Sequence, residues 1–176
     1  MSKNRLNIEI KSCEEWEKTP GFTEWERLLS SVLDCSISKK YGNDITAVTV
    51  DLHLINNLKM QELNLKFMQK NATTNVLSFP QFEATEIDFF LHSGWDHAIG
   101  DVFLSYNKIM QESQEFEIPF FNRCTHLFVH GVLHLIGMNH AITDAEKEME
   151  DTEICILEVF GIKNPYILGD QKIHEN

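Results

Sequence analysis

Three histidines near position 130 have the spacing of a metal site. The chain reads His-Gly-Val-Leu-His-Leu-Ile-Gly-Met-Asn-His from His130 through His134 to His140. Because His130 and His134 are four residues apart, a helix would place both side chains on one face. Gly137 can adopt the left-handed conformation that ends a helix, so the chain can turn and return His140 to that face. Three imidazoles leave one position of a tetrahedral ion open, so the run predicts one catalytic Zn²⁺ per chain, and Ni²⁺ suits the same ligands.

The same ligand spacing occurs in the H-E-x-x-H-x-x-G-x-x-H motif of zinc peptidases. Gly131 stands where that motif has its glutamate. The glutamate is the general base of peptide hydrolysis, and glycine has no group that could replace it. A zinc hydrolase acting on peptides or small molecules is therefore disfavoured. The structural alternative is that the three histidines are buried core residues of a helix.

Three segments together resemble the YbeY family of bacterial endoribonucleases, also called ribosomal RNA maturation factors. They are the histidine run, Thr74–Pro80 (TNVLSFP) and Gly100–Ser105 (GDVFLS). The resemblance implies a metal-dependent endoribonuclease that is specific for single strands and acts in 16S rRNA 3′-end maturation and ribosome quality control. Its partners would be ribosomal RNA or the ribosome, and not DNA. The resemblance also implies a four-stranded mixed sheet with one antiparallel edge strand, with the metal between the sheet and a central helix.

Two positions depart from the family pattern. Met68 stands where the family commonly has an arginine that is important for activity, and Asn139 stands where it commonly has an aspartate. Lys66 and Lys70 are nearby cations that could contact RNA phosphate, but a lysine does not reproduce the two-pronged grip of an arginine. A second hypothesis therefore stays open, in which the protein is a ribosome assembly factor that binds rRNA or a ribosomal protein and carries a mainly structural zinc.

Three further polar residues are candidates for a place in the site. Asp101, at the start of a predicted strand, could act as acid or base near the metal or could be a hydrogen-bonding turn residue. Ser78 could hydrogen-bond the substrate or simply pair on an edge strand. His126 lies four residues before His130, and each such step turns about 40° around the helix axis. We therefore expect His126 to support the site or the core rather than to bind the ion.

The net charge of −12 is unevenly distributed along the chain. Residues 1–80 hold 10 basic and 10 acidic side chains, whereas residues 81–176 hold 5 and 17. The first half therefore leaves room for an RNA-binding surface, where Lys59, Lys66 and Lys70 would form one stripe if their helix continues that far. A solvated helix face is the alternative interpretation of that stripe. The acidic second half could instead meet a basic ribosomal protein.

Hydrophobic periodicity predicts an α+β fold in a single domain spanning residues 1–176, with a peripheral tail after about 165. Strands are expected at Leu6–Ile10, Ile45–Ile55, Val76–Phe79 and Gly100–Leu104. About five helices are expected, at Phe22–Ser36, from Asn56 through Phe67, at Tyr106–Phe116, at Phe120–Ile136, and from a capping box at Thr143 and Glu146 to Gly161.

The remaining features restrict the environment rather than the chemistry. Residues 81–99 have no clear period, so we expect a loop or irregular hairpin beside the site, with His92 and His97 exposed to solvent rather than holding a second metal. The four cysteines show no C-x-x-C pair and are expected to be free thiols. The N-terminus lacks a signal-peptide pattern and no apolar run would span a membrane, so we expect a cytoplasmic protein without a membrane partner.

Overall fold

Four strands form one mixed sheet in the order β1-β2-β4-β3. The computed structural model describes residues 6–45, 47–138 and 143–167. Strands β1 (Leu6–Ser12), β2 (Val48–Ile55) and β4 (His97–Ser105) are parallel, and β3 (Val76–Pro80) pairs antiparallel with β4. The predicted α+β class and the sheet with one antiparallel edge strand are confirmed. Pro80 ends the edge strand, a position where a residue without an N–H costs the sheet no hydrogen bond.

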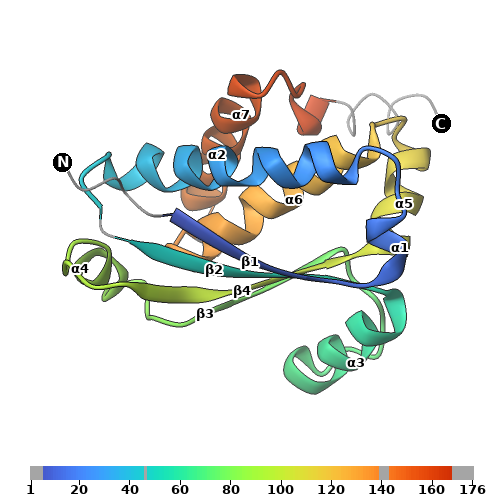
Figure 1. Cartoon of the computed structure of the whole chain (residues 1–176), viewed down its shortest axis with the longest axis horizontal. Helices are drawn as coiled ribbons and strands as arrows, with labels where there is room; N and C mark the ends of the chain where they lie inside the picture. The colour runs from blue at the N-terminus through green and yellow to red at the C-terminus, as the bar shows by residue number, and fades with distance from the viewer. Residues whose placement is uncertain (1–5, 46, 139–142, 168–176) are drawn as a thin grey trace.

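The two faces of the sheet have different surroundings. Along β2, residues alternate between buried and half-buried, so that Val50 and Leu52 enter the core while Asp51 and His53 face the other way. Figure 1 shows α2 (Phe22–Tyr41) and α6 (Phe120–Leu135) above the sheet and α3 (Asn57–Met68) on its opposite side. The main core therefore lies between the sheet and α2 and α6.

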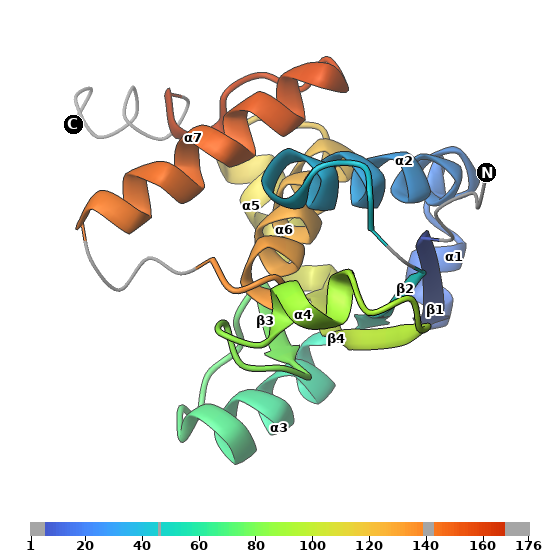
Figure 2. The same cartoon turned by 90° about the vertical axis from the view of Figure 1, so that its left-hand side faces the viewer.

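The other helices complete the layer over the core. Figure 2 shows α7 (Thr143–Val159) beside α2 and above α6, on the side of α6 away from the sheet. The remaining helices are α1 (Glu14–Glu17), α4 (Ile87–Leu91) and α5 (Tyr106–Glu115). Among the described residues, five helices have ten residues or more, which matches the predicted number. None of the described helices is both long and apolar enough to cross a bilayer.

Helix α6 approaches the sheet closely because it carries a glycine at the crossing point. A Cβ atom built on Gly131 would lie 2.8 Å from Cγ1 of Val102 on β4, closer than real carbon atoms approach. Gly131 therefore has a packing role in addition to its lack of a catalytic side chain. The glutamate that zinc peptidases carry at this position would not fit here without moving the helix away from the sheet.

Several predicted elements differ from the structure in detail. Residues 81–99 are not a single loop, since they contain α4 and the first residues of β4. Helix α3 starts at the predicted cap, where the Asn56 side chain accepts a hydrogen bond from the Lys59 backbone N–H at 3.0 Å. It ends at Met68, and Gln69 turns left-handed, so the stripe through Lys70 does not exist. The Thr143 side chain of the predicted capping box lies outside the described part. All four cysteines are free thiols, as predicted.

Candidate metal centre

His130 and His134 bring two imidazole nitrogens together on the last two turns of α6. Their Nε2 atoms are 3.1 Å apart, and the two rings are nearly perpendicular. Two ligands that are each about 2.0–2.1 Å from one tetrahedral zinc ion lie roughly 3.3 Å from each other. The predicted convergence of these two residues is thus present in the fold. The third predicted ligand, His140, lies outside the described residues, as does Asn139.

Each histidine is oriented through its other ring nitrogen. Nδ1 of His130 lies 2.8 Å from Oε1 of Glu153 on α7, and Nδ1 of His134 lies 3.0 Å from the backbone oxygen of Met138. A carbonyl oxygen only accepts hydrogen bonds, so Nδ1 of His134 carries the proton and donates it. Burial acts to raise the pKa of Glu153, but hydrogen bonds from His126 and His130 outweigh burial and lower that pKa to about 2. Glu153 is therefore an ionised acceptor.

These hydrogen bonds determine which nitrogens face each other. When both rings are neutral and both Nδ1 atoms donate, the Nε2 atoms of His130 and His134 present lone pairs to each other across 3.1 Å. Facing lone pairs repel one another, and a cation between them removes that repulsion. A partner that accepts from the second nitrogen of a histidine is also the usual support of a metal ligand. The two residues fit a metal ion, and imidazole nitrogens suit Zn²⁺.

The turn after α6 has the form that the sequence predicted for Gly137. This residue has φ +84°, in the left-handed region. Its N–H donates to the oxygen of His134 at 3.0 Å, and the N–H of Met138 donates to the oxygen of Leu133 at 2.9 Å. This pair of bonds is the Schellman motif, which reverses the chain at a helix end. It also places the Met138 oxygen where the His134 ring can donate to it.

A chain of buried polar groups extends from His130 toward the start of α6. Nη1 of Arg123 donates to Nδ1 of His126 at 2.9 Å, so the proton of the His126 ring is on Nε2. That nitrogen donates to Oε2 of Glu153 at 2.8 Å. The hydroxyl of Tyr166 donates to the same oxygen. Glu153 is thus held on both oxygens, which restricts the orientation of His130.

Arg123 is in turn held by Glu112 on α5. Its Nε and Nη2 atoms donate to Oε2 of Glu112 at 3.0 and 2.9 Å. The side-chain amide of Asn75 donates to both carboxylate oxygens of Glu112 at 3.1 Å. The side chains of Arg123 and Glu112 are only 15% and 10% exposed. A buried charge of this kind is tolerated because it is paired and hydrogen-bonded. The network fixes the relative positions of α5, α6 and α7 behind the histidine pair.

The histidine pair opens into a cleft of about 620 Å³. The cleft is bordered by His130 and His134 on α6, by Ser78 on β3, by Met68 at the end of α3 and by the segment after β3 at Glu83. Ser78 pairs with Val102, the residue that packs against Gly131, so its side chain is on the face of the sheet that α6 covers. The cleft therefore lies between the sheet and the central helix.

Comparison with known proteins identifies the family. Residues 11–161 match the family model described as Endoribonuclease YbeY. The Endoribonuclease YbeY of Bartonella bacilliformis is 34% identical over 165 residues, which cover 92% of this chain and 96% of that protein. The protein of the same name from Colwellia psychrerythraea is 42% identical, over 66% of this chain and 70% of its own length. This chain belongs to the YbeY family.

The fold agrees with a solved structure as well. The solution structure of TM1509 from Thermotoga maritima matches with a TM-score of 0.56 and 24% identity, covering 86% of this chain and 87% of that one. This likeness concerns the fold alone. Membership of the YbeY family supports a nuclease role, and the resemblance that the sequence motifs indicated is confirmed.

The structure does not bring Asp101 to the histidine pair of this YbeY-family chain. Asp101 pairs with Phe79 and its neighbour Val102 packs against α6, so the Asp101 side chain is on the opposite face of the sheet. There it lies 2.7 Å from Nε2 of His53. A direct role beside the metal, one of the two interpretations that the sequence left open, is thus inconsistent with its position. The alternation of β4 could have shown this, because Val102 and Leu104 are the buried residues.

Asp51, His53 and Asp101 form a second group that could hold a metal ion. One ligand atom from each lies within 4.8 Å of the others. Asp51 is already paired with Lys11 at 3.0 Å, and Asp101 with His53. The pair on α6 is the stronger candidate for the metal centre because it borders an open cleft, whereas this group lies on the opposite face of the sheet.

The predicted RNA-contacting lysines lie beside the cleft rather than in it. Lys66 and Lys70 are exposed near the end of α3 and are outside the set of residues that line the cleft. The Nζ atom of Lys66 lies 4.9 Å from the centre of the Phe67 ring. Met68 does line the cleft and is 48% exposed.

The other histidines have no part in the metal centre among the described residues. His92 is exposed, as predicted, and its Nδ1 lies 2.9 Å from the backbone oxygen of Asp88. His97 was expected to be exposed but is half-buried at the start of β4, against the rings of Phe82 and Phe90. His126 is buried and supports Glu153, which agrees with the prediction that it is not a ligand.

Sequence reasoning missed Glu153 and Arg123. Glu153 is 1% exposed on a face of α7 that also buries Met149, Ile156 and Leu157. An acidic residue at helical spacing among apolar ones is a signal for a buried partner, and it was available in the sequence. Arg123 is a charged residue on a mostly apolar helix, and that pattern alone does not specify its partners.

Proposed function

We propose that this protein is a metal-dependent endoribonuclease that cleaves single-stranded RNA, with zinc held by His130, His134 and His140. The observation that carries the proposal is the convergence of two imidazole nitrogens at 3.1 Å, with both rings oriented through Nδ1, at the wall of an open cleft. Family membership supports the nuclease activity. The open cleft of about 620 Å³ suits an unpaired strand.

The residues around the cleft have separable tasks in this proposal. When bound, the zinc ion supplies Lewis acidity for a phosphate oxygen or for water. Glu153 and the Met138 oxygen keep the two histidine rings in their ligand tautomers. The Ser78 hydroxyl borders the cleft and can donate a hydrogen bond to a phosphate oxygen. Attack by water or by the adjacent 2′-hydroxyl is compatible with these groups.

The cellular substrate is a finer proposal. By its family resemblance, we infer a role in the maturation of the 16S rRNA 3′ end and in ribosome quality control, in the cytoplasm. Ribosomal RNA or the ribosome would be the partner. The excess of acidic residues after position 80 favours an additional contact with a basic ribosomal protein.

The test is an RNA cleavage assay combined with elemental analysis of the purified protein. We expect one zinc or nickel ion per chain, cleavage of single-stranded RNA, and loss of cleavage on treatment with a chelator. His134→Ala should lose both metal and cleavage, while His92→Ala, which changes an exposed histidine away from the centre, should retain both. Cleavage that survives in metal-free protein or in His134→Ala would contradict the proposal.

An RNA-binding assembly factor with a mainly structural metal is the second candidate. The specific observation in its favour is that Met68 lines the cleft where the family commonly has an arginine, so a strong phosphate contact is missing. The same assay separates the two functions. Metal-bound protein that binds single-stranded RNA but does not cleave it would support the assembly factor.

A further inference from the structure

Two further cavities follow the cleft at the histidine pair along α6. A cavity of about 430 Å³ shares His130 and Val76 with the cleft. An outer cavity of about 270 Å³ shares Arg123 and His126 with that middle one. The three cavities therefore lie one after another along α6, from the metal centre to the start of the helix.

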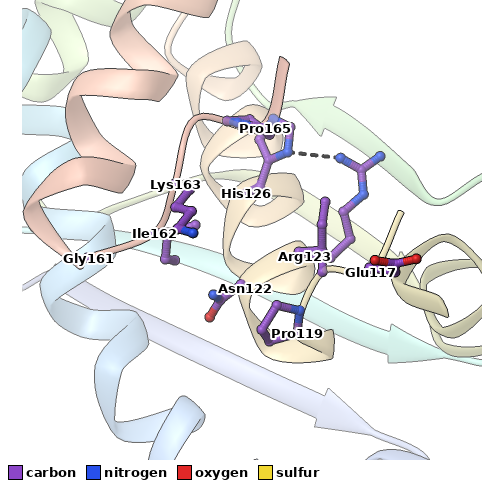
Figure 3. Close-up of a pocket in the computed structure, with 10 residues that line it drawn as sticks. Glu117, Pro119, Asn122, Arg123, His126, Gly161, Ile162, Lys163 and Pro165 are labelled. Atoms are coloured by element: carbon purple, nitrogen blue, oxygen red, sulfur yellow. Dashed lines mark hydrogen bonds between the residues drawn. The ribbon is translucent and has the colours of Figure 1, made fainter. Parts of the chain in front are cut away.

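The outer cavity has apolar walls and a few polar groups. Figure 3 shows Pro119 and Asn122 from the start of α6 on one side and Ile162 and Lys163, from the chain after α7, on the other. Ile118 and Pro165 complete the apolar surface. Its volume is slightly below the roughly 300–1,000 Å³ that small-molecule pockets occupy. A ligand of this cavity is thus small, with apolar faces.

The charges of the cavity favour a neutral ligand. Figure 3 shows the Arg123 guanidinium directed to His126, and its other nitrogens are engaged by Glu112. The Glu117 carboxylate also lines the cavity and disfavours a phosphate deep inside it. By contrast, the Asn122 side chain makes no hydrogen bond to another described residue, so its amide can offer both a donor and an acceptor. Lys163 is exposed at the rim of the outer cavity, where a phosphate of the RNA backbone could pass.

The distance from the metal centre suits a nucleotide of the same strand. Asn122 and His130 are eight residues apart on α6, which corresponds to about 12 Å along the helix axis. A stacked strand with roughly 3.4 Å per nucleotide covers this distance in about three to four nucleotides, and a more extended strand in fewer.

We propose that the outer cavity is a nucleobase subsite, which takes the base of a nucleotide up to about four positions from the cleaved bond. The amide of Asn122 contacts the edge of the base, and the apolar walls contact its faces. This inference rests on the proposed endoribonuclease function. The subsite gives Asn122 a contact with the RNA strand away from the cleaved bond. The metal ligands alone cannot supply such a contact.

The test is a scan of a single-stranded RNA octamer in which one base at a time is removed. With the zinc-loaded full-length protein, one abasic position near the cut should lower kcat/KM. Asn122→Leu should lower kcat/KM for the intact octamer roughly 3- to 10-fold, which is the loss expected for one hydrogen bond. The same variant should show no further loss with the sensitive abasic octamer, because the base and Asn122 act as a pair.

Two controls keep the outcomes distinct. Asn107→Leu makes the same change at an exposed position on α5 and should behave as the wild type, and Asn122→Leu should retain the wild-type zinc content. Asn122→Asp keeps the shape but removes the donor, so it should change the preferred base at the sensitive position. If the wild type cleaves RNA and Asn122→Leu shows the same dependence of kcat/KM on the abasic position as the wild type, the subsite alone is overturned. Absence of any cleavage by the wild type would overturn the proposed function and the subsite together.

Discussion

Oε1 of Glu153 lies 2.8 Å from Nδ1 of His130, although the two residues come from different helices. The carboxylate is 1% exposed and is also held by His126 and Tyr166, so it has little freedom to move. The metal centre therefore depends on the docking of α7 against α6 as well as on the histidine spacing.

The first prediction follows from this contact. Glu153→Gln should lower zinc affinity by about 10- to 100-fold, because residues that support a metal ligand typically contribute this much. Competition with a chromophoric chelator would measure the change. Glu158→Gln, at an exposed position on the same helix, should bind zinc like the wild type. Equal affinities for the two variants would mean that Glu153 does not orient the ligand.

Removal of the metal should lower thermal stability. A ligand that binds only the folded state at 100 times its Kd adds about 2.7 kcal/mol, which corresponds to roughly 5–10 °C in Tm for a chain of this size. Melting curves of chelator-treated protein with and without added zinc would measure the shift. The shift should be absent in His134→Ala, and a shift of the same size in that variant would show that zinc stabilises the protein at another place.

Gly131→Ala should destabilise the protein even though alanine favours helix. The new Cβ would lie 2.8 Å from Val102, and overpacking of this kind costs about 1–3 kcal/mol, against a gain of up to ~1 kcal/mol in helix propensity. Urea unfolding would measure the change. In a Val102→Ala background the same substitution should cost little or nothing. An equal cost in both backgrounds would contradict the assigned contact.

Metal-free protein should lose stability as the pH falls below about 6.5. Burial lowers the pKa of His126, so the unfolded chain takes up a proton there at a higher pH than the folded one. Stability then rises with pH through this range, by at most about 1.4 kcal/mol per pH unit for one group. Unfolding free energies of the wild type and His126→Gln between pH 5 and 7.5 would show a smaller slope in the variant. Parallel slopes would exclude His126 as the source.

Met68→Arg should raise RNA affinity and cleavage. The side chain borders the cleft and is 48% exposed, so we expect a gain below ~1.5 kcal/mol for a partly screened phosphate contact. Leu65→Arg is the matched control, because Leu65 is 50% exposed on the same helix and does not line the cleft. A similar gain in both variants would indicate a general effect of charge.

The two lysines near Met68 test the path of the strand. If RNA crosses the end of α3, Lys66→Ala and Lys70→Ala should each weaken binding and lower the slope of affinity against salt by roughly one ion. Fluorescence anisotropy across a salt series would measure the slope. Unchanged slopes in both variants would mean that RNA crosses another surface of the protein. The assignment of the metal centre would not be affected.

The sequence by itself determined the features that depend on neighbours in the chain. The spacing of His130 and His134 sets their common face on a helix, and Gly137 permits the left-handed turn after it. The side-chain cap of Asn56 and the alternation of β2 are equally local. Such features could be predicted because backbone geometry over one or two turns is set by the residues themselves.

Only the tertiary structure decided which distant residues meet. Glu153 reaches His130 because α7 docks on α6, and Met68 reaches the cleft because α3 ends there. Asp101 faces away from the metal centre because sheet pairing fixes which side of β4 is buried. These outcomes depend on how helices and strands pack to bury apolar surface, which periodicity within one segment does not specify.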